Sequence, residues 1–343
     1  MATPTTTKAF RRTQDGTTIE LTHEPIPALA PTQVLLRIHA VSLNYRDVAM
    51  LHGKYPVPVK ERGIPASDCA AEVIAVGSAV TDFVRGDRVA PIFDLKNITG
   101  TEDEMEALGG DVDGVLREYA VFEQEVLVPL PGGISWEEAA CITCAGTTAW
   151  KALGMPRSSG TALLQGTGGV SMFALLICLA AGIRPIITSS SDEKLETARS
   201  LGEPGVVQTI NYRTHTNWAE QAKILTNGRG VDVVIDNVGP TAIPQSLDSL
   251  ARRGLVSLVG FLGGFAVSEQ PDVLGPLLLK NAVMKGILPG SKSEQQDLCN
   301  FLEERKVPLR PLLDNRVFDF EESEAAFQYL NAGKHMGKVV IRV

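Results

Sequence analysis

The sequence of 343 residues has few cysteines, no long hydrophobic run and no surplus of basic charge. Its longest apolar run, Met172 to Ala181, is far shorter than the about 18 residues that a membrane-spanning helix needs. The net charge of −8 argues against nucleic acid or an anionic membrane as a partner, because phosphates are bound by clustered Lys and Arg. Neither end carries an apolar signal core or a retention sequence, so we expect a cytoplasmic protein.

The five cysteines are an odd number, and their spacing predicts reduced thiols rather than a disulfide framework. Cys141 and Cys144 form a CxxC motif, which can be redox-active or bind a metal. They lie in a run of small residues, Ala139 to Gly146, that is more typical of a tightly packed core helix. The histidines at positions 23, 39, 52, 215 and 335 stand singly, without the spacing of metal ligands, so the sequence predicts no metal site.

The segment from Thr161 to Lys194 is the most informative part of the chain. An apolar strand (Thr161 to Leu164) leads into a glycine turn, an almost wholly apolar helix and a second apolar strand at Pro185 to Thr188. Such a turn lets the backbone approach a pyrophosphate, which then lies at the positive end of the helix. Ser171 stands where the third glycine of the fingerprint is expected, and an ordinary strand–helix turn of another α/β protein is the alternative.

The rhythm of the sequence changes near residue 126. Before it, short strands are punctuated by Gly and Pro, as in an irregular β-rich domain; after it, strands alternate with helices, which predicts a parallel doubly wound sheet. The tail returns to helices and a final strand. Residues 96–114 are rich in Asp and Glu, which favours a solvated surface loop, with a lid over the site as the alternative.

Seven short motifs in this order resemble those of the medium-chain dehydrogenase/reductase superfamily. They are Ser42–Asp47, Gly53–Pro56, Ala75–Gly77, Gly86–Val89, Ala145–Ala149, Gln165–Val170 and Gly337–Ile341. The resemblance implies an α/β fold with a GroES-like β-rich catalytic domain (residues 1–125 and 290–343) and a Rossmann domain (residues 126–289). It also implies a homodimer.

Zinc-dependent members of that superfamily place a Cys, a His-Glu pair and a later Cys around the catalytic metal. In this sequence Asn44 to Asp47 and Ser67-Asp68 stand at the matching places, and the four close cysteines of a structural zinc lobe are missing. The chain therefore resembles the zinc-free branch of quinone oxidoreductases and enoyl reductases. That branch implies NADPH-dependent reduction of a carbon–carbon double bond conjugated to a carbonyl, in a small-molecule enone, enal, quinone or enoyl thioester.

In such a reaction hydride adds at the β-carbon and a proton arrives at the α-carbon, which a phenol can supply. Tyr55 follows Asn44 in an Asn-x-x-Asp then Gly-x-Tyr arrangement, where enoyl reductases carry their proposed proton donor; the alternative is packing beside Pro56. Asn44 is a candidate for binding substrate or the nicotinamide ribose. Arg46 and Asp47 are adjacent opposite charges, expected to form a structural pair rather than to act as catalysts.

Two other functions stay open from the sequence. A zinc-independent alcohol dehydrogenase or ketone reductase would use the same fold and cofactor. A non-catalytic nucleotide-binding protein is a remote alternative, which the full cofactor fingerprint argues against.

The cofactor is expected to lie along the carboxyl ends of the parallel strands. Thr148 matches a threonine that contacts the nicotinamide in relatives, with helix capping or back-bonding as its alternative. The complete set of expected cofactor-binding residues is Thr148, Gly166, Thr167, Gly168, Gly169, Val170, Ser190, Lys194, Tyr212, Asn237, Gly260, Phe261, Leu262, Leu288 and Lys338.

Three of these residues predict NADPH rather than NADH. NAD sites usually carry Asp or Glu about 20 residues after the glycine turn, whereas this strand ends in neutral Thr and Ser residues that include Ser190. Lys194 is expected to point back over the 2′-phosphate, and Tyr212 matches a tyrosine that flanks it in relatives. Asp192 and Glu193 are counter-evidence, although carboxylates in the first turn of a helix often favour its dipole.

Overall fold

The computed structural model describes residues 4–267 and 270–343, which divide into two compact units. The first unit runs to Thr147 and includes Pro289–Val343, and the second is Thr148–Leu288. Residues 1–3 and 268–269 lie outside the described part. The first three belong to the amino-terminal segment that we expect to carry no targeting signal. Among the described helices, none has the length and hydrophobicity needed to cross a membrane.

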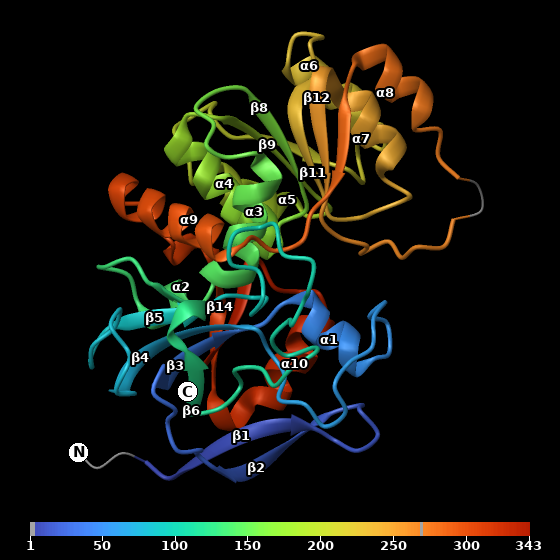
Figure 1. Ribbon diagram of the computed structural model, residues 1–343. Coiled ribbons are helices and arrows are strands. Elements are labelled where there is room, and N and C mark those ends of the chain that lie inside the picture. Colours follow the sequence, from blue (N-terminus) through green and yellow to red (C-terminus); the bar gives the residue numbers. More distant parts are fainter. Residues whose placement is uncertain (1–3, 268–269) are drawn as a thin grey trace. The chain divides into compact units, whose positions relative to one another are not determined.

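Both ends of the chain contribute strands to one sheet of the first unit (Figure 1). Its order is β14-β15-β3-β4-β5-β7, with β6 paired to β3. The strands are β3 (Gln33–Ser42), β4 (Asp68–Val76), β5 (Arg88–Pro91), β6 (Tyr119–Glu123), β7 (Leu127–Pro129), β14 (Leu313–Asp319) and β15 (Lys338–Arg342). Strand β15 runs antiparallel to β3, with Val340 opposite Ser42, so the last residues of the chain lie beside residues 40–44.

A two-stranded hairpin and short helices complete the first unit. The hairpin is β1 (Thr6–Arg12) with β2 (Ile19–Pro25). The helices are α1 (Tyr45–Leu51), α2 (Trp136–Ala139), α9 (Lys292–Arg305) and α10 (Ser323–Asn331), with 3-10 turns η1 (Gln124–Val126), η3 (Arg310–Leu312) and η4 (Phe320–Glu322) and the π-helix η2 (Ile142–Gly146). Helix α3 (Thr147–Leu153) leads into the second unit.

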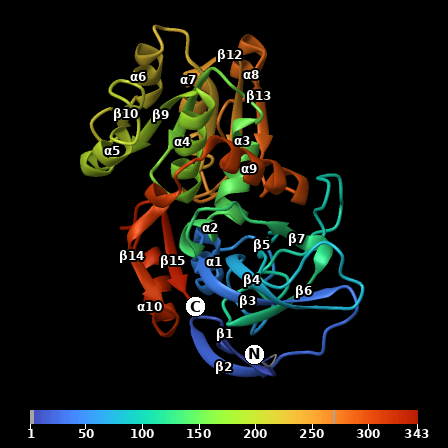
Figure 2. The ribbon, with the colours of Figure 1, turned by 90° about the vertical axis from the view of Figure 1, so that its left-hand side faces the viewer.

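The second unit is built on a six-stranded parallel sheet of order β10-β9-β8-β11-β12-β13, which confirms the predicted Rossmann fold. Its strands are β8 (Thr161–Gln165), β9 (Arg184–Ser189), β10 (Gln208–Asn211), β11 (Val231–Asp236), β12 (Leu250–Leu258) and β13 (Val283–Gly286). Its helices are α4 (Gly169–Ala181), α5 (Asp192–Arg199), α6 (Trp218–Leu225), α7 (Ile243–Ser249) and α8 (Leu274–Lys280). Helices α4 and α5 pack against strands β8 to β10, whereas α7 packs against β11, β12 and its neighbours α6 and α8 (Figure 2).

The first unit continues past residue 125, where the sequence placed the domain boundary. Strand β7 pairs with β5, and α2 packs on β3 and β4, so residues 127–139 belong to the first unit. The first helices after residue 126 therefore belong to the first unit, and the second unit begins only at Thr148.

The acidic segment 96–114 is only partly the solvated loop that its composition predicts. Residues 99–105 are exposed, but residues 107–110 are buried and Leu108 is fully enclosed. Backbone hydrogen bonds from Leu108 N to Phe93 O (2.9 Å) and from Leu95 N to Glu106 O (3.0 Å) hold the segment on the first unit. Its second half is held by buried apolar residues and also by Asp113, which pairs with Arg11 and Lys60 at 3.2 Å each.

Candidate functional site

The glycine turn after β8 has the geometry that an anion site requires. Gly166 has a φ of +79°, and a Cβ added at Gly166 or at Gly168 would meet no atom within 4 Å. Helix α4 begins at Gly169 with Gly168 as its N-cap, so no side chain caps its first N–H groups. The turn, which includes the predicted Thr167 and Val170, leaves backbone donors and open space at the positive end of a 13-residue helix.

Ser171, the departure from the glycine fingerprint, fixes this turn to the neighbouring strand. Its Oγ donates to the carbonyl oxygen of Gln165 (2.7 Å) and accepts from Nδ2 of Asn237 (2.9 Å). Asn237 Nδ2 also donates to Gln165 O at 2.9 Å. A serine thus links the end of β8 to the end of β11, a contact that the sequence pattern does not reveal.

A buried carboxylate organises the loop that follows β11. One oxygen of Asp236 accepts from the backbone N–H groups of Val238 and Gly239, and the other accepts from Ser246 Oγ at 2.6 Å. Gly260, at the end of the next strand, passes so close that a Cβ would lie 2.7 Å from Asn237 O. These contacts set the backbone on which Asn237 and Gly260 are presented.

The residues expected to read the 2′-phosphate gather at the ends of β9 and β10. Ser190 follows β9 directly, and Tyr212 N donates to Ser189 O at 3.1 Å. Lys194 N donates to the N-cap hydroxyl of α5 at Ser191 (3.3 Å). Ser190, Lys194 and Tyr212 therefore belong to one edge of the sheet.

Asp192, one of the two acidic residues that count against NADPH, has a partner within the protein. Asp192 Oδ1 accepts from Asn211 Nδ2 at 2.7 Å. This bond ties the start of α5 to the end of β10, so the carboxylate has a structural role in addition to favouring the helix dipole.

Apolar residues complete the carboxyl edge of the second sheet. Phe261 stacks on Phe265 with ring centroids 4.7 Å apart, while Leu262 and Leu288 are 57% and 65% exposed. Thr148 is buried in α3, and the hydroxyl that back-bonds in this helix is that of the preceding Thr147, which donates to Thr143 O.

In the first unit the structure brings Tyr55 to Arg46. Arg46 Nε lies 3.5 Å from the Tyr55 hydroxyl, and its guanidinium stacks over the rings of Tyr55 and Phe93 at 5.4 and 4.7 Å. Arg46 Nη1 donates to Leu108 O at 2.8 Å. The expected pair with Asp47 is weaker, since the closest N···O distance is 4.0 Å. Arg46 thus holds the candidate proton donor, a role that the sequence did not suggest.

Asp47 is enclosed behind this arginine. One carboxylate oxygen accepts from Asn44 N at 2.8 Å, and the other is buried without a hydrogen-bond partner among the residues that the structure describes. Burial raises the pKa of Asp47.

Lys338 was expected at the cofactor, but its ammonium is engaged inside the first unit. It is 3% exposed, donates to Leu43 O (2.8 Å) and Asn44 Oδ1 (2.5 Å), and lies 3.5 Å from Asp68 Oδ2. Asn44 Nδ2 in turn donates to Asp68 at 3.0 Å. The pairing of β15 with β3 creates this network, and it leaves Lys338 as a residue that positions Asn44.

These side chains do not suit a zinc ion. Asp68 accepts from Ser67 Oγ and Asn44 Nδ2, and a protein ammonium already supplies the positive charge beside it. Burial raises the pKa of the Cys144 thiol, in the CxxC motif, to about 12, which disfavours the thiolate that zinc binds. Within residues 4–267 and 270–343, no three His, Cys, Asp or Glu side chains are grouped to hold a metal.

Two family models match the sequence, one in each part of the chain. The "alcohol dehydrogenase GroES-like domain" matches residues 30–132, and the "zinc-binding dehydrogenase" model matches residues 169–304. The second name refers to zinc, for which residues 4–267 and 270–343 present no group of three His, Cys, Asp or Glu side chains.

Similar proteins carry both dehydrogenase and quinone reductase names. A zinc-type alcohol dehydrogenase-like protein of Schizosaccharomyces pombe is 38% identical over 92% of both chains. A quinone oxidoreductase of Pseudomonas aeruginosa is 37% identical over 68% of this chain and 66% of its own. A solved structure from Sinorhizobium meliloti, named as an alcohol dehydrogenase, is 36% identical, covers 100% of both chains and has a TM-score of 0.88.

Proposed function

Because this chain belongs to the medium-chain dehydrogenase/reductase superfamily of nicotinamide-dependent oxidoreductases, we propose that it reduces carbonyl-conjugated carbon–carbon double bonds with NADPH and without a metal. The observation that carries this proposal is the Tyr55 hydroxyl held by the buried guanidinium of Arg46. A zinc enzyme polarises its substrate with the metal, whereas this arrangement offers a proton donor instead.

The bound nicotinamide would supply a hydride to the β-carbon of the substrate. Tyr55 would then transfer its hydroxyl proton to the α-carbon, where the enolate carries negative charge. The phenolate that remains faces Arg46 Nε, which would stabilise it until a proton returns from solvent. Asn44, oriented by Lys338 and Asp68, is the candidate hydrogen-bond donor or acceptor for the substrate or the nicotinamide ribose.

The preference for NADPH is supported by the end of β9. Ser190 is neutral, and Lys194 and Tyr212 come from the neighbouring ends of α5 and β10. A cation near this edge would favour the 2′-phosphate through charge-assisted hydrogen bonds. The turn Gly166–Val170 would hold the pyrophosphate.

The test is a substrate panel with the purified protein. NADPH and NADH oxidation would be followed with enones, enals, quinones, enoyl thioesters and simple ketones, before and after dialysis against a strong chelator. We expect the highest kcat/KM for NADPH with a conjugated substrate and no loss after chelation. Loss of activity together with about one zinc per chain would disprove the metal-free mechanism.

A zinc-independent alcohol dehydrogenase or ketone reductase is the second candidate. It is favoured by the names of the S. pombe and S. meliloti relatives. The same panel separates the two functions, since a ketone reductase would turn over saturated ketones at least as well as enones.

We also propose that the protein acts as a homodimer. The edge strand β13 has β12 as its one neighbour in the described sheet, and β13 and α8 expose Val283 (55%), Leu278 (71%) and Leu279 (86%). Exposed apolar side chains beside an open sheet edge favour a partner, and a second copy presents the same surface. Leu279→Glu should shift the sedimentation mass toward the monomer, while the exposed Val84→Glu in the first unit should not.

The cytoplasm is the compartment that we propose for this activity. All five cysteines are free thiols, which suits a reducing compartment. Burial raises the pKa of Cys141 to about 11 and that of Cys299 to about 12. Cell fractionation with an antibody would test the location.

A further inference from the structure

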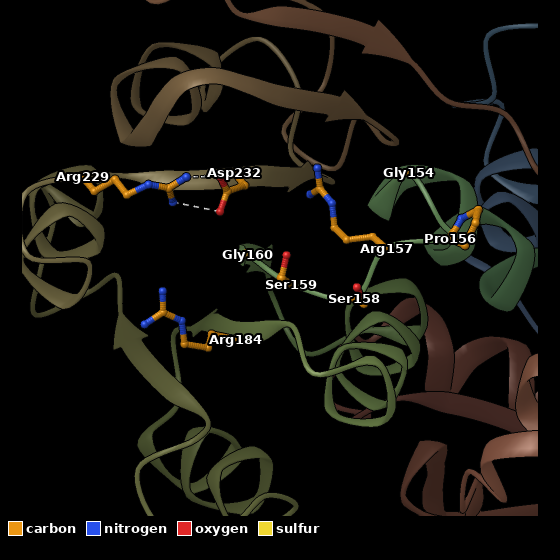
Figure 3. Close-up of a pocket in the computed structure, with 9 residues that line it drawn as sticks. All are labelled: Gly154, Pro156, Arg157, Ser158, Ser159, Gly160, Arg184, Arg229 and Asp232. Carbon is orange, nitrogen blue, oxygen red and sulfur yellow. Dashed lines mark hydrogen bonds and ion pairs between the residues drawn. The ribbon is translucent and has the colours of Figure 1, made fainter.

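The amino-terminal edge of the second unit's sheet carries a hollow that the cofactor turn does not use. Its volume is about 670 Å³, and Figure 3 shows that it lies between the starts of β8, β9 and β11. The glycine turn follows the carboxyl end of β8. The hollow and the turn are therefore at opposite ends of the same strands.

Positive charge dominates the lining of this hollow. Arg157, Arg184 and Arg229 face it together with a single carboxylate, Asp232 (Figure 3). Asp232 is already engaged, because it accepts from Arg229 at 2.5 and 3.0 Å and from Thr161 N at 2.8 Å. Arg229 and Asp232 largely neutralise each other, which leaves two guanidinium groups to set the charge.

Arg157 and Arg184 are held less firmly by the protein than Arg229 is, although the charge of Arg157 contributes to lowering the pKa of Asp232. In the parts of the chain that the structure describes, the side chains of Arg157 and Arg184 form no ion pair or hydrogen bond within distance limits, and Nη1 of Arg157 is buried without an acceptor. A buried donor without an acceptor is costly, so it indicates a ligand or solvent group in this position. The protein has a net charge of −8, so these two arginines make the hollow locally positive on a negatively charged molecule.

We propose that this hollow binds a phosphorylated small molecule through its phosphate or pyrophosphate group. Guanidinium groups bind phosphate oxygens with paired N–H donors, which suits Arg157 and Arg184 on two sides of the space. The exposed Ser158 and Ser159 add hydroxyl donors beside Arg157. The volume exceeds that of a single phosphate and leaves room for an organic portion.

Calorimetric titration of the full-length protein with inorganic pyrophosphate, at constant ionic strength in potassium chloride, tests the proposal. Arg184→Gln and Arg157→Gln should each raise the dissociation constant of pyrophosphate at the hollow by about tenfold or more, the scale of a charge-assisted contact. Arg305→Gln removes the same charge from an exposed position on α9 of the first unit and should change nothing. Equal weakening by all three variants would indicate general screening and would overturn the site.

The cofactor turn also attracts phosphates, so a second variant separates the two sites. Pyrophosphate bound at the hollow should remain in Gly166→Ala, whereas pyrophosphate bound at the turn should not. Binding that Gly166→Ala abolishes and Arg184→Gln leaves intact would disprove the proposal. Arg184 is exposed, so its replacement should leave the thermal unfolding midpoint unchanged even if that of the half-buried Arg157 does not.

Discussion

The two units of the molecule prepare for a ligand in different ways. In the second unit, the turn Gly166–Val170 offers backbone N–H groups and open space, and its residues are neighbours in sequence. In the first unit, the site is made of buried polar and charged side chains, and Lys338 meets Asn44 from 294 positions away. One site depends on backbone shape and the other on charge compensation.

This difference decides how each site should respond to substitution. A site of backbone donors loses function when atoms fill its space, although the fold can remain stable. A site of buried charges loses stability when one charge is removed, because its partner remains without compensation in a medium of low polarity. Variants chosen in matched pairs can separate these two behaviours.

The largest effect is expected in the buried network. Lys338→Met removes the ammonium that donates to Leu43 O and Asn44 Oδ1 and faces Asp68, so we expect a loss of about 3–5 kcal/mol in the free energy of unfolding. Denaturant unfolding would measure it. The exposed Lys334→Met should change stability by less than about 0.5 kcal/mol. Equal losses in the two variants would mean that the network does not hold the first unit together.

Removal of the Tyr55 hydroxyl should affect catalysis rather than folding. Tyr55→Phe is expected to lower kcat with an enone by about 10- to 1000-fold, the range of acid–base contributions with some replacement by water. The dissociation constant of NADPH should stay the same. Tyr329→Phe removes a hydroxyl that binds Asp314 and is the control for loss of a phenol. An unchanged chemical step in Tyr55→Phe would assign Tyr55 to packing.

The features that the sequence predicted are those encoded over short distances. The alternation of strands and helices predicted the parallel sheet, whereas the domain built from both chain ends was implied by the resemblance to the superfamily. The boundary at residue 125 was wrong because the helices that follow it pack on the first sheet. The change in the sequence pattern indicates where helices begin, but it does not indicate which sheet those helices pack on.

The contacts that the sequence missed depend on strand register and loop paths. Lys338 reaches Asn44 because β15 pairs with β3, and Arg46 finds an acceptor at Leu108 because the acidic segment folds back on the first unit. Neither contact follows from residue type. Ser171 appeared only as a defect in a glycine pattern until its bond to Asn237 gave it a structural role.

A smaller effect, confined to one cofactor, is expected at the end of β9. Lys194→Ala should lower kcat/KM for NADPH by a factor that corresponds to about 1–3 kcal/mol. It should leave kcat/KM for NADH nearly unchanged, because only NADPH carries the 2′-phosphate. Lys223→Ala, which removes an ammonium paired with Asp248 in the same unit, is the control. A wild type that prefers NADH, or equal losses with both cofactors, would show that Ser190 and Lys194 do not read the phosphate.

The smallest effect is expected at the glycine turn, where a ligand needs open space beside the backbone. Gly166 and Gly205 have φ values of +79° and +85°, and a Cβ at either would meet no protein atom within 4 Å. Replacement by Ala should therefore lower the free energy of unfolding by about 1–2 kcal/mol in both variants, because alanine is strained in the left-handed backbone conformation. Only at Gly166 would the new methyl group enter the path of the pyrophosphate, so we expect the NADPH dissociation constant to rise about tenfold in Gly166→Ala and to stay at the wild-type value in Gly205→Ala. Fluorescence titration beside an unfolding curve measures both quantities. If the two variants lose affinity to the same extent, general destabilisation explains the loss and the turn is not the cofactor site.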